Sequence, residues 1–395
     1  MAVACIQFVN ILDFVMVMPL GPDFCEALGI PTSDLGLLAG SYTLAAAIAG
    51  VIGSLVLERF DRKKAVLCAL IGLSVATAAA ALATGKLSLL LARVLAGAFG
   101  GPATALSYAI VADVVPAGRR GRAIGTIMMA FSVAAVLGVP VGLEAARLAG
   151  WRAPFVGTAF LGAVTVLFAA RVLPSLRDHL AAPGAGGPGV RGMVSLLRAP
   201  LVRSSFAMTA FTLCSVFLII PNISAYVQEN LGFPREHLGL LYLGGGIASF
   251  ASLRKAGGLV DRYGATKVGT AGACVLMATI YAGFGIFPPL IPAPVIFVLF
   301  MLSSAFRNVA HTTLTSKVPG PAERARFLSL QSTVQHLSTS TGAILSTHVL
   351  AVGGDRKLVH MDRLALVSIS LCAFLPVLFY RVERRLPKAD PAPSV

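Results

Sequence analysis

Apolar residues occur along this 395-residue chain in twelve long stretches separated by short polar connections. Each stretch has about 17 to 25 residues, enough for an α-helix to cross the roughly 30 Å hydrocarbon core of a bilayer. The pattern therefore predicts an all-α membrane protein with twelve transmembrane helices. We expect the spans at 3–21, 35–57, 65–84, 87–110, 122–146, 152–173, 203–227, 237–259, 267–287, 292–315, 327–351 and 363–381.

A charged loop recurs at corresponding places in the two halves of the chain. Glu58, Arg59, Asp61 and Arg62 lie between spans two and three, and Asp261 and Arg262 lie between spans eight and nine. This repeat predicts two pseudo-symmetric six-helix bundles, 1–173 and 203–395, an architecture typical of transporters. The connection 174–202 contains a run of alanine, glycine and proline, which predicts a flexible cytoplasmic linker.

Composition and charge exclude several classes of protein. With 56% hydrophobic and 12% charged residues, the chain has too few charges to cover a water-facing surface. The sequence has no phosphate-binding loop and no zinc-protease motif, and its six cysteines lack metal-ligand spacing, so we predict no enzyme, metal or cofactor. Of the 32 lysines and arginines, 23 fall on one side of the predicted spans. This asymmetry predicts that both termini are cytoplasmic and argues against a nucleic-acid surface.

Apart from charges near the ends of the predicted spans, three charged residues lie in the interior of the membrane: Asp13, Arg93 and Arg307. Each costs roughly 2.5 to 3.5 kcal/mol on insertion scales, so we expect them to face a water-filled cavity or one another. Desolvation favours the neutral acid and a nearby arginine favours the carboxylate, which makes Asp13 a candidate proton carrier together with Arg93. The alternative is a fixed Asp13–Arg93 ion pair that only holds spans one and four together.

Other polar residues on apolar spans are candidates for lining a substrate cavity. Arg307 and His311 stand four residues apart and so share one face of span ten. The remaining candidates are Asn10, Asn222, Gln331 and Gln335. Such side chains can instead hydrogen-bond one helix to another, at about 0.6 kcal/mol each, and both interpretations remain open.

The loop and helix motifs resemble those of the major facilitator superfamily, especially its drug and sugar efflux branch. The family's first loop pattern, G-x-L-x-D-R-x-G-R-K, is matched at Glu58, Arg59, Arg62 and Lys63, with Asp61 in the place of the second glycine. Span four carries Arg93 and Gly97 in an R-x-x-x-G pattern and ends at Asp113. Span five carries Gly138, Pro140 and Gly142, similar to the antiporter pattern G-P-x-x-G but with Val139 inserted.

The resemblance implies roles for these residues. Glu58 is expected to meet the N-terminus of span eleven, and Arg62 is expected to pair with Asp113 and close the cytoplasmic side in one conformation. The tight turn at Asp61 predicts left-handed backbone. The alternative is a run of solvated charges that only determines how the chain is oriented in the membrane.

Span five has a mechanical interpretation of its own. Pro140 is expected to kink the span, and Gly138 and Gly142 are expected to let its outer end approach the other half. Ordinary small-residue packing is the alternative.

Together these features predict a secondary transporter that exports a small organic molecule, most simply by proton antiport. Proton-coupled or facilitated uptake is the first alternative, and a non-transporting sensor or scaffold is the second. The expected partners are a small-molecule substrate, protons and the lipid bilayer. We expect a functional monomer in a bacterial inner membrane.

Overall fold

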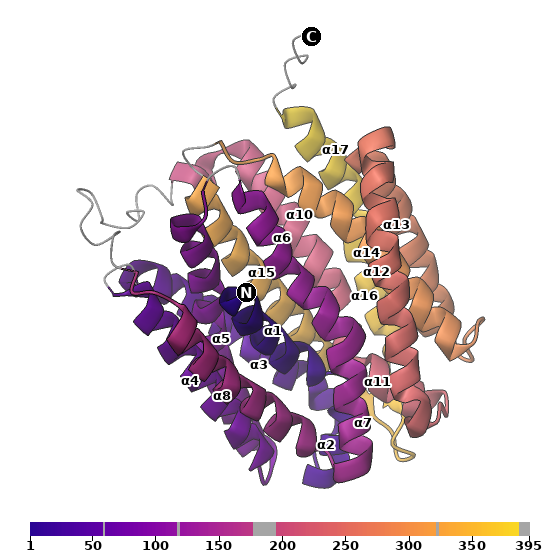
Figure 1. The fold of residues 1–395 in the computed structure, drawn as a ribbon. Helices are drawn as coiled ribbons and strands as arrows, with labels where there is room; N and C mark the ends of the chain where they lie inside the picture. Colours follow the sequence, from indigo (N-terminus) through magenta and orange to yellow (C-terminus); the bar gives the residue numbers. More distant parts are fainter. Residues whose placement is uncertain (58–59, 117–118, 177–194, 321–323, 387–395) are drawn as a thin grey trace.

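The structure is a computed structural model that describes residues 1–57, 60–116, 119–176, 195–320 and 324–386. Nearly all of these residues are helical (Figure 1). The N-terminal half contains α1 (Ala2–Met16), α2 (Gly21–Leu28), the 3₁₀ turn η1 (Thr32–Asp34), α3 (Leu35–Val56), α4 (Arg62–Ala81), α5 (Lys86–Val114), α6 (Arg120–Val133), the π-helical η4 (Ala134–Gly138), α7 (Val139–Ala149) and α8 (Ala153–Val172).

The C-terminal half follows the same order of helices. It contains α10 (Pro200–Phe217), η6 (Ile220–Asn222), α11 (Ile223–Ala225), η7 (Tyr226–Asn230), η8 (Arg235–His237), α12 (Leu238–Tyr263), α13 (Ala265–Ile280), η9 (Tyr281–Gly285), α14 (Ala293–Ser316), α15 (Arg324–Val349), α16 (Met361–Ala373) and α17 (Leu375–Arg385). Between α15 and α16, the strands β1 (Ala351–Val352) and β2 (Leu358–Val359) form a short antiparallel hairpin that pairs Ala351 with Val359.

Nine helical segments in the described part of the chain are long and apolar enough to cross a membrane, and the bent pair α1 and α2 makes a tenth. The two expected spans that do not qualify are α12 and α15, although each is a helix of 26 residues. Charges near the end of α12 and the many serines, threonines and glutamines of α15 lower their hydropathy. Both helices pack against the other half, where less apolar surface is needed than against lipid.

The first span is bent, whereas the sequence predicted one helix over 3–21. Helix α1 ends at Met16, and α2 leaves it at an angle of 60°. Pro19 lies in the break and Pro22 lies in the first turn of α2. A proline lacks an N–H donor and disfavours helical backbone in the residue before it, so two prolines three residues apart explain why the helix cannot continue straight.

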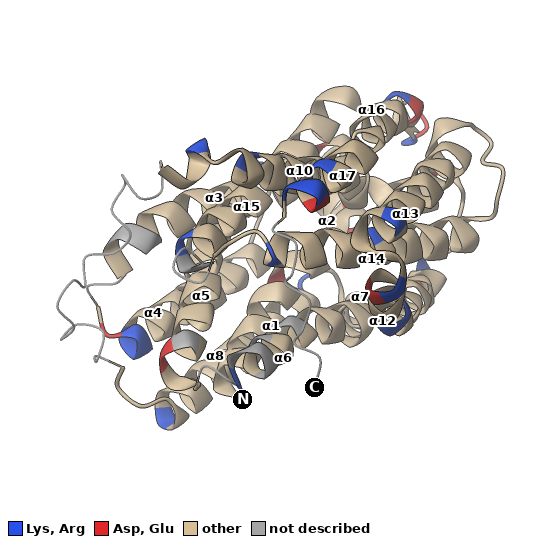
Figure 2. Cartoon of the chain, turned by 90° about the horizontal axis from the view of Figure 1, so that it is seen from above, with Lys and Arg blue, Asp and Glu red and all other residues tan. Residues whose placement is uncertain are grey.

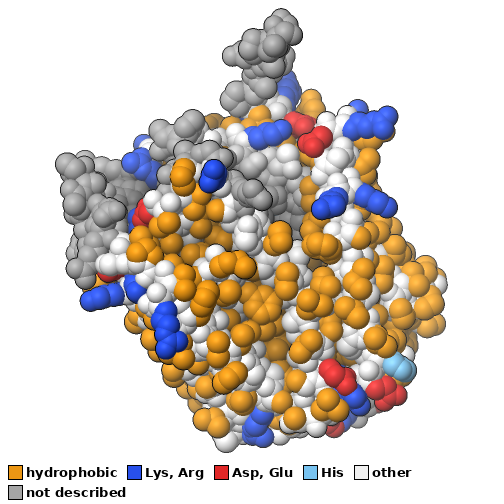
Figure 3. Space-filling view, in the orientation of Figure 1, with side chains coloured by type: hydrophobic (Ala, Val, Ile, Leu, Met, Phe, Trp, Pro, Cys, Tyr) orange, Lys and Arg blue, Asp and Glu red, His pale blue; other side chains and the backbone are white. Residues whose placement is uncertain are grey.

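Apolar side chains cover the middle of the molecule, and charged side chains gather near its ends. The face drawn in Figure 3 shows this hydrophobic belt between blue and red groups. Large apolar residues such as Ile52, Val75, Val141 and Leu240 are more than half exposed. A soluble protein would bury most of them, so this surface fits a multi-pass membrane protein.

The two halves meet along two seams, which Figure 2 shows from above. Helix α3 packs on α15 at one seam, and α7 packs on α12 at the other. At the first seam, a Cβ on Gly36 would lie 2.0 Å from the carbonyl oxygen of Ala343, so only glycine allows this close approach. The hydroxyl of Ser340 also donates to the carbonyl of Gly40, at 2.9 Å.

Candidate functional site

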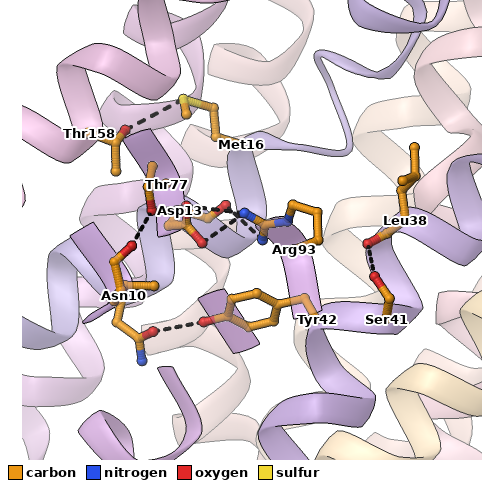
Figure 4. A network of polar contacts seen from close by, with 10 residues as sticks. Asn10, Asp13, Met16, Leu38, Ser41, Tyr42, Thr77, Arg93 and Thr158 are labelled. Atoms are coloured by element: carbon orange, nitrogen blue, oxygen red, sulfur yellow. Dashed lines mark hydrogen bonds and ion pairs between the residues drawn. The ribbon is translucent and has the colours of Figure 1, made fainter. Parts of the chain in front are cut away.

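A buried ion pair joins the first and fourth spans of the N-terminal half. Arg93 Nη1 of α5 lies 3.1 Å from Oδ1 and 3.0 Å from Oδ2 of Asp13, on α1 (Figure 4). Arg93 Nη2 reaches the carbonyl of Asp13 at 3.4 Å. The structure thus brings together Asp13 and Arg93, the two residues that the sequence analysis gave as candidates for proton coupling.

Neighbouring helices hold both members of this pair. Thr77 of α4 donates a hydrogen bond of 2.7 Å to Asp13 Oδ1. The ring of Tyr42, on α3, lies under the Arg93 guanidinium at 4.7 Å, a cation–π contact. Tyr42 donates to Asn10 Oδ1 at 2.8 Å (Figure 4). Asn10 in turn donates to Thr104 and to the Gly100 carbonyl. Asn10 therefore supports the ion pair from one helical turn away.

The spacing of Arg93 and Gly97 has a physical reason. A Cβ on Gly97 would lie 2.0 Å from the carbonyl oxygen of Tyr42, so α3 and α5 could not approach each other at this level with any other residue. That close approach is what places the Tyr42 ring against Arg93. The motif therefore combines the charge of Arg93 with the missing side chain of Gly97, which lets the helix of Tyr42 come close.

All three intramembrane ionisable groups are shielded from solvent in this conformation. Asp13 is 0% exposed, and Arg93 and Arg307 are 1% exposed. The sequence left two alternatives open, a water-filled cavity or mutual contact, and in this state Asp13 and Arg93 show mutual contact. Arg307 lies apart from them in the C-terminal half.

Arg307 of α14 is held by α10 rather than by a carboxylate. Its Nη1 donates to Ser215 Oγ at 3.1 Å, and its Nη2 donates to the Thr212 carbonyl at 2.9 Å. No salt bridge to Arg307 occurs among the described residues, and its Nε has no hydrogen-bond partner there. A buried cation without a counter-ion is costly, so this site differs in kind from the Asp13–Arg93 pair.

The other polar candidates of the C-terminal half are distributed over three helices. His311 Nε2 lies 2.9 Å from Thr209 Oγ1, which also accepts a 2.7 Å hydrogen bond from Gln331. Asn222 is fully buried and donates to Ser346 Oγ at 3.0 Å, linking η6 to α15. Gln335, one turn beyond Gln331, is exposed. In this conformation His311, Gln331 and Asn222 join helices, the alternative that the sequence left open.

The first charged loop forms the ion pair implied by the family resemblance. Arg62 Nε, at the start of α4, lies 2.5 Å from Asp113 Oδ2, near the end of α5. Both helices belong to the N-terminal half, so this pair joins neighbours within one half. Glu58 and Arg59, and with them the expected contact to span eleven, lie outside the described residues.

Asp61 caps a helix instead of forming a left-handed turn. Its φ is −55°, which contradicts the predicted left-handed backbone. Its Oδ1 accepts from the Lys63 amide at 2.9 Å and from the Leu176 amide at 3.2 Å, and Ser175 donates to its Oδ2 at 2.7 Å. The short acid therefore satisfies one free backbone donor in the first turn of α4, that of Lys63, and ties the loop to the segment after α8.

The second charged loop differs from the first. Asp261 and Arg262 form the exposed last turn of α12, and Arg262 lies over the ring of Tyr263 at 5.2 Å. Here Gly264 makes the left-handed turn into α13, with a φ of +91°.

Span five contains a π-helical turn next to its proline. The turn η4 ends at Gly138, two residues before Pro140. A Cβ on Gly138 would meet Leu12 at 2.5 Å, and one on Gly142 would meet Met16 Sδ at 2.8 Å. Both contacts belong to α1, so the expectation that these glycines face the other half is wrong.

The close approach across the seam comes from the opposite helix. A Cβ on Gly246 of α12 would lie 3.1 Å from Val136 Cα, and one on Gly239 would lie 3.8 Å from the Pro140 carbonyl. The small residues of α12, rather than those of span five, bring the halves together here.

Sequence reasoning missed a set of polar contacts at the end of the molecule that carries α2 and the β-hairpin (bottom of Figure 1). Arg235 binds Asp23 through two hydrogen bonds, at 2.7 and 2.5 Å. Arg356 pairs with Glu26 at 3.1 Å, and Thr32 donates to Glu229 at 3.3 Å. We call these contacts the inter-half clasp. Each of these contacts joins one half to the other. In the sequence, only the charges of the short loops could have indicated them.

Comparison with known proteins decides the family. The family model of the Major Facilitator Superfamily matches residues 3–343 and, in a second match, residues 205–394. The chain belongs to the Major Facilitator Superfamily. It is therefore a membrane transporter and not an enzyme, as the sequence predicted.

Relatives and solved structures agree with this assignment. The purine ribonucleoside efflux pump NepI of Salmonella paratyphi B is 26% identical over 350 residues, which cover 88% of this chain and 85% of the relative. A bacterial homologue of the human lysosomal transporter Spinster, in an inward-facing and occupied conformation, has a TM-score of 0.77 at 15% identity and covers 100% of this chain and 98% of its own. A D-xylose–proton symporter has a TM-score of 0.76 at 17% identity, with coverages of 98% and 97%. The two structures show a shared fold.

Proposed function

We propose that this superfamily transporter exports a small organic molecule in exchange for protons. Two six-helix bundles, 1–173 and 203–395, alternate in access around a central path and are joined by a cytoplasmic linker, 174–202. The bundles contain twelve transmembrane helices, counting the polar helices α12 and α15 and the bent first span. Both termini lie in the cytoplasm of a bacterial cell, and one copy of the chain suffices.

The direction of transport rests on the named relative and on span five. An efflux pump is similar to this chain over most of its length. Gly138, Pro140 and Gly142 resemble the antiporter pattern, and the helix that carries them packs on α12 at a seam between the halves. A tight seam at this place would prevent protons from leaking past the substrate.

The buried Asp13–Arg93 pair is the observation that carries proton coupling. A proton on Asp13 neutralises the carboxylate but keeps its oxygens as hydrogen-bond acceptors for Arg93, at the cost of leaving the Arg93 cation without a counter-ion. Arg93 keeps the face of Tyr42 in either state. The pair can therefore change charge while its helices stay packed, which a proton antiporter requires.

Substrate contacts are proposed for the polar residues of the C-terminal half. Arg307, His311, Gln331 and Asn222 are buried in the described conformation, so they reach substrate only when α10 and α14 separate. Gln335 is already exposed. The unpaired charge of Arg307 favours polar or anionic substrates.

Uptake by proton symport is the second candidate. The likeness to a D-xylose–proton symporter favours it, because the same fold serves both directions of transport. Inside-out vesicles separate the two possibilities. With an acidic lumen, an exporter accumulates its substrate in the lumen, whereas a symporter drives that substrate outward.

The experiment is a substrate panel in such vesicles, beginning with purine ribonucleosides because of the named relative. We expect at least one compound to accumulate in a pH-dependent way, and Asp13→Asn to abolish the accumulation while the protein remains in the membrane. Accumulation that persists in Asp13→Asn would contradict the proton role of this residue. Movement out of an acidic lumen would establish uptake instead.

A further inference from the structure

The hydroxyl of Thr77 has two acceptors and one proton. It lies 2.7 Å from Asp13 Oδ1 and 2.8 Å from the carbonyl oxygen of Leu73, one turn earlier in α4. A hydroxyl group can donate only one hydrogen bond, although it can also accept. With Asp13 ionised, the Thr77 hydroxyl can therefore donate to only one of these two oxygens at a time, and the Leu73 carbonyl also has its backbone hydrogen bond within α4.

Protonation of Asp13 removes this conflict. A proton on Oδ1 points toward Thr77 Oγ1, which accepts it, and the Thr77 hydroxyl rotates to donate to Leu73. Arg93 stays bonded to Oδ2, at 3.0 Å, and stays on the ring of Tyr42. No heavy atom has to move between the two arrangements.

The ability of Thr77 to switch from donor to acceptor matters because both groups are buried. Asp13 is 0% and Thr77 is 1% exposed, so solvent does not reach either group in this conformation. A buried donor left without a partner costs about 1 to 3 kcal/mol, and the acid proton would be such a donor without Thr77. In the part of the chain that the structure describes, the ionisable groups that interact with Asp13 are Arg93 from α5 and Tyr42 from α3, while α8 contributes the neutral Thr158 next to Met16.

We propose that Thr77 is a positioning residue that stabilises both protonation states of Asp13, as donor to the carboxylate and as acceptor from the acid. This inference rests on the proposed function, in which Asp13 exchanges the proton. The proton enters Oδ1 from water in a conformation that opens the site, and it leaves to water in the same way. The Thr77 proton only rotates and is never transferred.

Infrared difference spectroscopy on proteoliposome films tests the proposal. A change from alkaline to acidic buffer should produce the carbonyl-stretch band of a protonated carboxylic acid that is absent in Asp13→Asn. In Thr77→Val, which keeps the shape but loses the hydroxyl, this band should move to higher wavenumber because the acid has lost its acceptor. Thr77→Ser should restore the original position. Proton-driven transport should fall roughly tenfold in Thr77→Val, as expected for a lost hydrogen bond to a charged group.

Thr165→Val is the matched control. Thr165 of α8 also donates to the carbonyl four residues earlier, at 2.8 Å, and is 5% exposed, but its hydroxyl bonds Leu161 and not Asp13. This variant should leave the band unchanged. If Thr77→Val does not reach the membrane, Thr77→Ala removes the same hydroxyl and should show the same shift.

The two possible failures are distinguishable. A wild-type protein without any band that depends on Asp13 would overturn the proposed proton role itself. A wild-type band whose position is the same in Thr77→Val or Thr77→Ala would overturn the role of Thr77 and leave that of Asp13 intact.

Discussion

At the scale of residues, the two buried arginines have opposite environments. Arg93 has a carboxylate and an aromatic face as partners, whereas Arg307 has a hydroxyl and a carbonyl. Charge pairing therefore explains why Arg93 is tolerated in the membrane but not why Arg307 is. This difference leads to two separate predictions.

Removing Arg93 should destabilise the fold. Arg93→Gln leaves the Asp13 carboxylate buried without its cation, which costs about 3 to 5 kcal/mol. The double variant Asp13→Asn/Arg93→Gln should recover much of this loss because no charge remains. Thermal unfolding of the purified protein in detergent measures both effects. Equal unfolding temperatures for the single and double variants would show that the pair is not coupled.

Removing Arg307 should instead impair function and spare the fold. Arg307→Met deletes a buried charge that has no carboxylate partner among the described residues, so the unfolding temperature should stay level or rise. Transport should be lost if this charge contacts the substrate. A variant that unfolds at a much lower temperature would assign Arg307 a structural role.

The sequence could predict Asp13 and Arg93 because charge in an apolar span demands a partner. It could not predict Thr77, since a hydroxyl can bond within its own helix and so leaves no pattern. Nor could it predict that Arg307 would be held by the α10 carbonyl of Thr212. Such contacts depend on how helices rotate against one another, and single-sequence periodicity does not contain that information.

At the scale of elements, apolar length predicted where helices lie but not where they break. The bend between α1 and α2 and the π-helical turns η4, η7 and η9 depend on local backbone contacts. Pro140 was expected to kink span five, and the irregularity that the structure shows there is instead the π-helical turn that ends two residues before it. The seam glycines of α12 were visible in the sequence, but the surface that they face was not.

The seam between α3 and α15 provides an element-scale prediction. Gly36→Leu should wedge these helices apart, because a Cβ there would overlap a backbone carbonyl. Gly50→Leu is the matched control on the same helix, since nothing lies within 4 Å of its Cβ position. Cys25, buried in α2, reports opening of this end when a membrane-impermeant maleimide is added on that side of the membrane. We expect faster labelling of Cys25 in Gly36→Leu alone. Equal rates in both variants would contradict the claim that close packing of α3 on α15 keeps this end closed.

At the scale of the whole molecule, the inter-half clasp holds the two halves together at the end that carries α2. The Asp23 and Arg235 side chains are 22% and 26% exposed, so their ion pair is only partly screened by solvent. Such a pair contributes about 1 kcal/mol, or roughly a fivefold change in a two-state equilibrium. The clasp therefore biases the conformational equilibrium without fixing it.

Breaking the clasp should favour opening of that end. Asp23→Asn should raise the rate of Cys25 labelling roughly fivefold, while the swapped pair Asp23→Arg/Arg235→Asp should return it toward the wild-type rate. High salt should weaken the difference between wild type and Asp23→Asn. Equal rates of Cys25 labelling in wild type, Asp23→Asn and the swapped pair would show that apolar packing alone closes this end.

The most direct test of proton exchange at Asp13 is proton movement driven by a substrate gradient. Proteoliposomes that contain a pH-sensitive dye and an outward gradient of a transported compound should show coupled proton flux with the wild-type protein. Asp13→Asn, present in the same amount and orientation, should show none. Equal proton flux in Asp13→Asn would contradict the account, because the proton would then cross the membrane without the buried carboxylate.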